Sequence, residues 1–286
     1  MLPRCAVGSG PEALRTLRSD RPAAAVPLLR QSGTGRVLWA RDADPARGYD
    51  GPAAWLRLPD GIVGLAPPGT ALGPLWMSRP EPWPALEDGA TVTVDEAGLH
   101  GPDGALVVDR RQAVAWKGPL PDPAQLSAAS ARAIVTGALA SCHRSVLLDD
   151  PWRAAVEPAV STIGRLEPLD GLTAVARALG GLGPGLTPAG DDALSGVLFA
   201  YRAMIGPSAE PALLSVARSV STGELAAAVL LAAATGAHIE PVHDLVMAAV
   251  TDDRAAAGKA ATALDRFGSS SGADIAYGLR LAFTRR

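Results

Sequence analysis

The sequence contains no asparagine and only two lysines among its 286 residues. Without asparagine there is no N-glycosylation sequon. The lysines, Lys117 and Lys259, are not part of a Gly-Lys-Ser/Thr motif, so a P-loop nucleotide hydrolase is excluded. The two cysteines, Cys5 and Cys142, form no Cys-x-x-Cys pair. We therefore expect neither a disulfide framework nor a cysteine zinc site, and the sparse cysteine favours a reducing compartment.

Aromatic residues are only 4% of the chain, and the net charge is −3. The sequence thus lacks the basic stripe and the base-stacking side chains of a general nucleic-acid binder. The longest apolar run, around 226–234, is shorter than the roughly 20 residues of a membrane span. No apolar signal-peptide core is visible near the N-terminus. We expect a soluble, cytoplasmic protein with no nucleic-acid or membrane partner.

The hydrophobic pattern changes near residue 120. Before it, short apolar stretches alternate with turn formers such as Pro59-Asp60-Gly61, a pattern typical of a small antiparallel barrel or sandwich. A helix is expected near residues 11–18, ahead of the strands. The expected strands cover residues 36–40, 54–58, 62–65, 90–94, 105–108 and 113–116.

After the proline-rich linker 119–123, the pattern becomes helical and rich in Ala and Leu. The expected helices cover residues 124–142, 151–163, 170–179, 188–205, 209–219, 223–235, 240–250, 252–266 and 272–283. We therefore predict an α+β fold with two domains. A β-rich, barrel- or sandwich-like domain covers residues 1–120, and an all-α domain covers residues 121–286.

One segment of the helical domain, GGLGPGLTPAGDD at 180–192, has an unusual glycine content. Thr187 before Pro188 predicts an N-cap and a helix that begins at Pro188. The loop from Gly183 to Gly185 would then present backbone N–H groups to an anion at the helix N-terminus. Gly190 in the first turn costs about 1 kcal/mol relative to Ala. Such a glycine predicts that a ligand or another backbone comes close.

Two adjacent acids, Asp191 and Asp192, fall in the first turn of this helix. The simpler explanation is that each stabilises the helix N-terminus, by roughly 0.3–1 kcal/mol. Neighbouring helical positions diverge by about 100 degrees, so the two carboxylates cannot be equally buried. One of them is free to face a cleft, where it would bind Mg²⁺, a cation that takes few protein carboxylates.

The segment GSSSGADIAYGL at 268–279 repeats this spacing. When Gly190 is aligned with Gly272, Asp192 falls on Asp274. Each copy then has a small-residue loop, a helix start and an acid in the first turn. Either the echo is a chance product of a glycine- and alanine-rich chain, or the two helix N-termini face a common site.

A glycine follows each aspartate by four positions, Gly196 after Asp192 and Gly278 after Asp274. Residues four apart lie on one face of a helix, so each glycine would let another helix approach the aspartate-bearing face. In the same alignment Thr187 corresponds to Ser269. The two helices are therefore expected to pack closely.

These patterns give a set of candidate site residues. The candidate catalytic residues are Asp192, Asp274 and Thr187. The candidate substrate- or anion-binding residues are Gly183, Gly185, Thr187, Gly190, Ser269, Ser270, Ser271 and Gly272. The candidate Mg²⁺ ligands are Asp191, Asp192 and Asp274.

Other polar residues give weaker signals. Thr222-Gly223-Glu224 begins a helix, and Glu224 could add a carboxylate to the site, although an ordinary cap explains it better. His238 and His243 match no metal-binding spacing, and we expect them to be solvated at a helix end. His143 follows Cys142, but adjacent helical residues point apart, so Cys–His chemistry is not expected.

The sequences GLGPGLTPAGDDALSGVLFA and GSSSGADIAYGL resemble two signatures of a bacterial family, the AllH-type subunits of oxamate carbamoyltransferase. The resemblance is specific over about 180–200 and 266–283. It implies transfer of a carbamoyl group between oxalurate and phosphate in purine (allantoin) catabolism. It also implies partner subunits, including one that is similar to acyl-CoA synthetases.

Such a transfer needs a pocket for phosphoryl oxygens and stabilisation of charge at the carbonyl. In this chain the glycine loop would supply N–H donors, and Thr187, Ser269 and Ser270 would supply hydroxyls. Mg²⁺ on Asp192 and Asp274 would neutralise the charge of a small anionic substrate. Two alternatives stay open. The chain could be a non-catalytic assembly subunit whose glycines serve packing, or a stand-alone Mg²⁺-dependent enzyme acting on a small carboxylate or phosphate ester.

Overall fold

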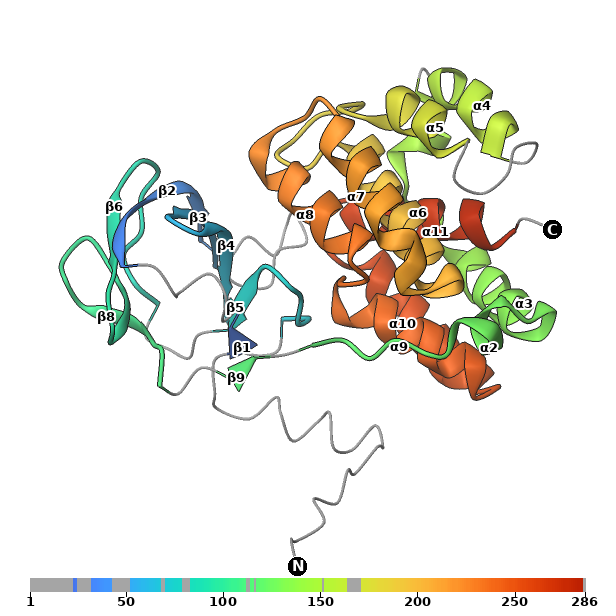
Figure 1. Ribbon diagram of the computed structural model, residues 1–286. Coiled ribbons are helices and arrows are strands. Elements are labelled where there is room, and N and C mark those ends of the chain that lie inside the picture. The colour runs from blue at the N-terminus through green and yellow to red at the C-terminus, as the bar shows by residue number, and fades with distance from the viewer. Residues whose placement is uncertain are drawn as a thin grey trace, which may run out of the picture. The chain divides into compact units, whose positions relative to one another are not determined.

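The computed structural model consists of two compact units, of which the second begins its main segment at Lys117 (Figure 1). The predicted boundary after residue 120 lies just beyond this point. The helix expected near residues 11–18 falls outside the described part of the chain. The structure describes residues 23–24, 32–42, 52–67, 70–78, 83–111, 114–115, 117–150, 152–163 and 171–284.

The first unit is built on a curled seven-stranded sheet, a half-barrel, which confirms the predicted β-rich fold. The strand order is β5-β4-β3-β2-β6-β7-β8, and every neighbouring pair except β4–β5 is antiparallel. The strands are β2 (Gly33–Arg41), β3 (Ala53–Leu58), β4 (Gly61–Ala66), β5 (Trp76–Ser78), β6 (Thr91–Val94), β7 (Gly98–His100) and β8 (Leu106–Asp109).

The sheet follows the predicted alternation of apolar and turn residues. The turn at Pro59-Asp60 joins β3 to β4, and Gly61 after it has a φ of 143°, which glycine adopts without strain. A separate two-stranded sheet pairs β1 (Ala23–Ala24) with β9 (Val114–Ala115) in parallel. The two parallel pairs depart from the purely antiparallel expectation, and β1, β5 and β7 were not predicted. All three have only two or three residues, too few for a readable alternation.

The second unit is helical, as predicted, and the described part of 188–283 contains no strand. Its helices match the expected ranges within two residues, apart from the first. They are α2 (Pro123–Ser127), α3 (Ala129–Ala138), α4 (Trp152–Ile163), α5 (Leu172–Leu179), α6 (Ala189–Ile205), α7 (Glu210–Ser219), α8 (Glu224–Ala234), α9 (Glu240–Val250), α10 (Arg254–Asp265) and α11 (Ser271–Phe283).

The single helix predicted over 124–142 is wrong. Ala128 has an extended conformation between α2 and α3, and the last turn, Leu139–Ser141, is a 3-10 helix. The Ser127 hydroxyl donates to the Met204 carbonyl at 3.0 Å. This contact with the end of α6 fixes the chain at the break, a tertiary interaction that propensity alone does not reveal.

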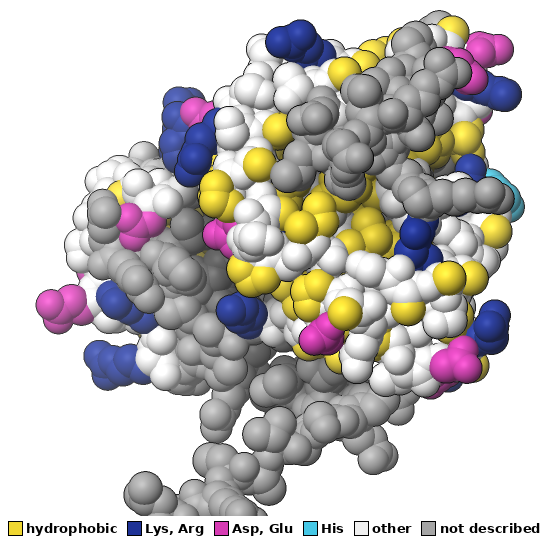
Figure 2. All heavy atoms as spheres, turned by 45° about the vertical axis from the view of Figure 1, so that its right-hand side comes forward, with side chains coloured by type: hydrophobic (Ala, Val, Ile, Leu, Met, Phe, Trp, Pro, Cys, Tyr) yellow, Lys and Arg dark blue, Asp and Glu magenta, His cyan; other side chains and the backbone are white. Residues whose placement is uncertain are grey.

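Helix α6 is the centre of the helical unit and contacts α2, α5, α7, α8 and α11. It is buried on every side over most of its length, as a helix without a polar face must be. Helix α11 packs along it and is also largely buried. Figure 2 shows hydrophobic side chains on one face of the molecule among scattered charged ones. Within the described residues, no helix is long and apolar enough to cross a membrane.

Candidate functional site

Helix α6 begins at Ala189, and Pro188 is its N-cap. The prediction that Thr187 caps the helix is therefore wrong. Instead, the Leu182 carbonyl accepts the N–H of Gly190 at 2.8 Å, so the glycine loop itself satisfies this early helical donor. Thr187 is left free to face the other motif, where its hydroxyl lies 3.4 Å from that of Ser271.

Helix α11 begins in an equivalent way. Ser270 is its N-cap without a side-chain cap bond, and Gly272 donates its N–H to the Phe267 carbonyl at 2.9 Å. The Asp274 N–H donates to the Ser270 carbonyl at 2.9 Å, just as Asp192 donates to Pro188 at 3.0 Å. The predicted echo is thus a structural repeat of two helix starts, with Asp192 and Asp274 at matching positions.

Gly190 and Gly272 have matching environments. A Cβ on Gly190 would overlap the carbonyl oxygen of Leu179 at the end of α5, and a Cβ on Gly272 would overlap that of Leu264 near the end of α10. The expectation of a close approach at Gly190 is confirmed, and the neighbour is a backbone. Because both N–H groups already donate within the protein, packing accounts for these two glycines.

The glycines four positions after the aspartates bring α6 and α11 together. A Cβ on Gly196 would overlap the Ile275 carbonyl oxygen, and a Cβ on Gly278 would overlap the Ala193 carbonyl oxygen. Ala193 and Ile275 each follow an aspartate directly. The contact is therefore reciprocal, and it confirms that the glycines admit a neighbouring helix on the aspartate-bearing faces.

Asp192 and Asp274 are buried, with side chains in the interior of the unit at 4% and 0% exposure. The Asp274 Oδ1 accepts from the Ser145 hydroxyl at 2.7 Å and from the Val146 N–H at 3.1 Å. The Oδ2 atoms of both aspartates are buried and have no hydrogen-bond partner within the protein. A buried carboxylate oxygen without a partner is costly, so these two atoms require an explanation.

Burial shifts the protonation of both groups. It raises the pKa of the Asp192 carboxyl well above its ordinary value; the Ser271 hydroxyl opposes this, and the Asp274 charge adds to it. Burial also raises the pKa of the Asp274 carboxyl, against the hydrogen bond from Ser145. Two like charges close together disfavour double ionisation. The pair is therefore suited to hold a proton or a cation.

The expectation that Asp191 and Asp192 are unequally buried is wrong, because both residues are buried, at 1% and 4% exposure. They differ in their hydrogen-bond partners. The Asp191 Oδ1 accepts from the Gly181 N–H at 2.9 Å, and its Oδ2 accepts from the Thr222 hydroxyl. Burial raises the pKa of this carboxyl as well, and both hydrogen bonds oppose the shift. With both oxygens bonded, Asp191 ties the glycine loop to the start of α8. Thr222 is the residue of that segment that bonds to Asp191, and Glu224 is exposed.

The loops that precede the two helices differ in length. Seven residues separate Leu182 from Gly190, whereas four separate Phe267 from Gly272. The longer loop contains Gly183 and Gly185, with φ values of 107° and 103°, a left-handed conformation that favours glycine. Gly185 is exposed, and Gly183 is half-buried.

The serines of the second loop surround the start of α11. Ser269 is exposed, and Ser270 and Ser271 are half-buried. The Arg144 guanidinium donates to the Ser269 carbonyl at 3.0 Å and to the Asp265 carbonyl at 3.2 Å. The segment from Arg144 to Val146 thus encloses this helix start. Sequence reasoning missed it, because its partners lie more than a hundred residues further along the chain and no local motif marks them.

The arrangement of the carboxylates can be compared with what a metal requires. In the described part of the chain, no three His, Cys, Asp or Glu side chains are grouped to hold a metal ion. A fully protein-ligated centre does not fit. Mg²⁺ commonly takes one or two carboxylates and retains several waters. The unpartnered Oδ2 atoms of Asp192 and Asp274 could provide these two carboxylate ligands.

The prediction of solvated histidines is wrong. His238 and His243 are both buried, and burial lowers the pKa of His238 to about 3 and that of His243 to about 4. Their ring nitrogens are bonded to backbone and side-chain groups inside the unit. His143, in contrast, is exposed beside the buried Cys142. Burial raises the pKa of that thiol to about 11, which makes it a poor nucleophile.

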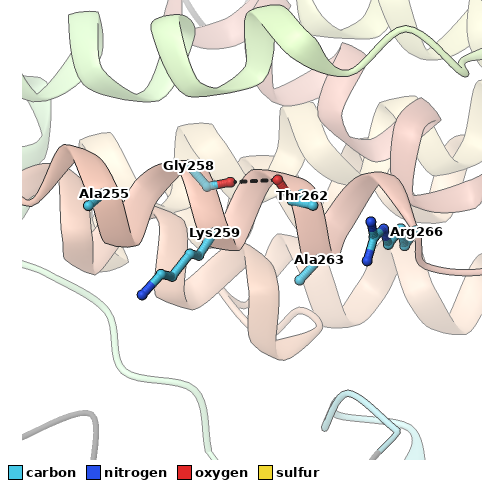
Figure 3. A pocket seen from close by; sticks show the side chains of 6 residues that line it. All are labelled: Ala255, Gly258, Lys259, Thr262, Ala263 and Arg266. Carbon is cyan, nitrogen blue, oxygen red and sulfur yellow. Dashed lines mark hydrogen bonds between the residues drawn. The ribbon is translucent and has the colours of Figure 1, made fainter.

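A hollow of about 480 Å³ lies along α10, and none of the predicted site residues lines it (Figure 3). It contains the cationic side chains of Lys259 and Arg266, and the Thr262 hydroxyl donates to the Gly258 carbonyl at 2.9 Å. It has no acidic side chain among its lining residues. It is wide open and formed by one face of a single helix, so it does not define a binding site.

One family model matches a segment of the chain that contains both motifs. Residues 179–283 match the family model described as oxamate carbamoyltransferase subunit AllH. The match begins at the last residue of α5 and ends at the last residue of α11. It includes both aspartates and both glycine contacts, and it covers 105 of the 286 residues. The family model is named for one subunit of a carbamoyltransferase. No curated protein and no solved structure gave a significant match.

Proposed function

We propose that the protein is a subunit of a carbamoyltransferase-type enzyme that acts on oxamate or oxalurate and carbamoyl phosphate. Its site lies where the N-termini of α6 and α11 converge. One observation carries the proposal. Asp192 and Asp274 occupy equivalent positions on two packed helices, and each has a buried carboxylate oxygen without a partner. Both lie within the family match.

Mg²⁺ would be held by the Oδ2 atoms of Asp192 and Asp274, together with water. When bound, it would neutralise anionic charge and polarise a carbonyl or phosphoryl oxygen. The hydrogen-bond donors that an anionic substrate needs are provided by groups around the two acids. Thr187, Ser269, Ser270 and Ser271 offer hydroxyls to an anionic substrate, and the loop around Gly183 and Gly185 offers backbone N–H groups.

The reaction needs no protein nucleophile. A phosphate oxygen of inorganic phosphate attacks the carbamoyl carbon of oxalurate, and the bond from that carbon to the oxamate nitrogen breaks. The proton of the phosphate passes to the departing nitrogen, which gives oxamate and carbamoyl phosphate. The residues of this chain bind and orient the two anions. The cationic clamp that phosphate usually requires comes from Arg144 or from a partner subunit, such as the acyl-CoA-synthetase-like one.

A turnover assay tests this assignment. The complex, with its partner subunits, is assayed for carbamoyl phosphate formation as wild type, Asp192→Asn and Asp274→Asn. We expect each variant to lose about 100-fold or more, the usual effect of removing one preorganised electrostatic group. Asp149→Asn, at an exposed position, is the matched control and should keep full activity. Full activity in both site variants would contradict a catalytic role.

A second function is favoured by the glycine contacts. Gly190, Gly196, Gly272 and Gly278 all lie against backbone, so packing alone accounts for them. A non-catalytic assembly subunit would need these glycines and would tolerate loss of the Asp192 charge. In that case Asp192→Asn would leave turnover intact, whereas Gly278→Ala would reduce recovery of the assembled complex.

A further inference from the structure

A hydrogen-bonded chain begins in the segment that enters the helical unit. His243 on α9 donates from Nδ1 to the Pro119 carbonyl at 2.9 Å. The His243 ring also lies against Gly118, where a Cβ would overlap the imidazole. Both contacts join α9 to residues 124 or more positions earlier in the sequence. The entering segment is therefore held directly on the His243 ring.

From His243 the series of hydrogen bonds continues to α6. The His238 N–H donates to His243 Nε2 at 3.1 Å, and His238 Nε2 lies 3.1 Å from the Ser195 hydroxyl. The Ser195 hydroxyl in turn donates to the Asp192 carbonyl at 2.7 Å. Four successive hydrogen bonds thus connect Pro119 to the residue that carries one of the two site carboxylates.

The donors and acceptors fix the tautomer of each imidazole. His238 Nδ1 accepts the Ile239 N–H at 2.9 Å, so this nitrogen carries no proton. Because the Ser195 proton is directed at the Asp192 carbonyl, His238 Nε2 must be the donor to Ser195. His243 Nε2 accepts from the His238 backbone, so its proton is on Nδ1. The two rings have opposite tautomers, and both are neutral.

The rings also pack against α6. Phe199 meets both imidazoles edge to face, with ring centroids 5.6 Å from His238 and 5.1 Å from His243. Phe199 lies one turn after Ser195, and Ser195 is fully buried. The histidine pair therefore holds α6 at two successive turns, by a hydrogen bond and by ring contacts.

We propose that His238 and His243 couple the entering segment to the carboxylate-bearing turn of α6, and that Ser195 is a positioning residue for Asp192. This inference rests on the proposed function only in taking Asp192 as a site residue. A carboxylate that binds a ligand needs a fixed backbone. The hydrogen bonds from Ser195 and His238 hold the Asp192 backbone in place from outside the first turn of α6. A displacement of the segment at Gly118–Pro119 would therefore change the position of the Asp192 backbone, because the His243 and His238 rings connect the two.

Hydrogen exchange in the full-length protein tests the coupling. Gly118→Ala disturbs the hydrogen-bond series at its first contact, the His243 ring. Ser195→Ala removes the last donor of the series, the hydroxyl bonded to the Asp192 carbonyl. Both should speed exchange of the Asp191 and Asp192 amides by about tenfold or more, while amides in α10 change little. Ser219→Ala is the matched control, because Ser219 also donates to the carbonyl three residues before it, at 2.8 Å. Unchanged exchange in α6, or a uniform rise in all helices, would overturn the proposal.

Nitrogen-15 spectra of the histidine rings give a second, independent readout. In the wild type at neutral pH, His238 should show a proton on Nε2 and His243 a proton on Nδ1. In Ser195→Ala, the His238 Nε2 proton loses its acceptor, so its signal should shift and its exchange with water should quicken. If both rings carried the proton on the same nitrogen in the wild type, or if either ring were charged, the proposed series of hydrogen bonds would be contradicted.

Mn²⁺ titration separates this inference from the proposed function. If the wild type binds Mn²⁺, Ser195→Ala should weaken the affinity by about threefold to tenfold, and Ser219→Ala should not. If the wild type binds no Mn²⁺, the metal assignment fails, and the exchange experiment still decides the coupling. Wild-type Mn²⁺ affinity in Ser195→Ala would show that Ser195 does not position Asp192.

Discussion

Gly196 and Gly278 lie at equivalent places in the contact between α6 and α11, each against the backbone of the opposite helix. Gly196 faces the carbonyl of Ile275, and Gly278 faces that of Ala193. Because each glycine lies four residues after an aspartate, the same contact brings Asp192 and Asp274 together. The local symmetry of the packing is thus the physical reason that the two acids lie at equivalent positions of one helix pair.

Substitution of these glycines should be costly. Gly278→Ala forces a methyl group into the Ala193 carbonyl, and we expect a loss of about 1–3 kcal/mol in the free energy of unfolding. Gly258→Ala is the matched control, because a Cβ there meets no atom within 4 Å. In that helix interior Ala should stabilise the protein by roughly 0.5–1 kcal/mol. Denaturant titration measures both; wild-type stability in Gly278→Ala would refute the close contact.

Loss of a contact to Asp191 should reduce stability, whereas loss of the Asp192 charge should reduce turnover. Thr222→Val preserves side-chain volume but removes the hydroxyl that donates to Asp191. Because it leaves a carboxylate oxygen of the buried Asp191 without that donor, we expect a loss of about 1–3 kcal/mol of stability. Turnover of the folded protein should stay near the wild-type value. A large loss of turnover with unchanged stability would instead place Asp191 in the site.

The buried histidines predict a pH dependence of stability. Their folded pKa values, about 3 for His238 and about 4 for His243, lie below the ordinary value of 6.5. The unfolded chain therefore takes up protons first as the pH falls. The stabilisation is fully present above pH 6.5 and is lost as the pH falls toward the folded values, by about 2 kcal/mol for each ring between pH 7 and pH 5.

The variant His238→Gln isolates this effect. Gln does not titrate and can accept and donate at nearly the same places. The buried carboxyls have raised pKa values and act in the opposite direction, but they are common to both proteins and cancel in the comparison. The stability difference between wild type and His238→Gln should shrink as the pH is lowered from 7 to 5. A constant difference over this interval would mean that His238 is not buried in its neutral form.

The sequence predicted the helices well because their boundaries are marked locally. Apolar periodicity, Gly-rich breaks and first-turn acids placed α5 to α11 within two residues. The aligned motifs also predicted the packing of Gly196 and Gly278. The short strands β5 and β7 were missed, because three residues are too few to show an alternation of apolar and polar side chains.

The parts of the site that were missed depend on contacts between segments distant in sequence. Ser145 binds Asp274 across 129 positions, and His243 binds Pro119 across 124. Each buried histidine has one ring nitrogen bonded to a group distant in sequence, His238 to Ser195 and His243 to Pro119, and the sequence gives no sign of these contacts. Thr187 has the pattern of a cap, but the Leu182 carbonyl takes the Gly190 donor instead.

A cation titration tests most directly whether Asp192 and Asp274 bind one ligand together, as we propose. Mn²⁺ replaces Mg²⁺ as the probe, and its binding is followed by electron paramagnetic resonance in wild type, Asp192→Asn and Asp274→Asn. We predict one site in the wild type and an affinity at least about tenfold weaker in each variant, with folding unimpaired. A wild type that binds no Mn²⁺, or variants that bind it as tightly as the wild type, would contradict the shared site.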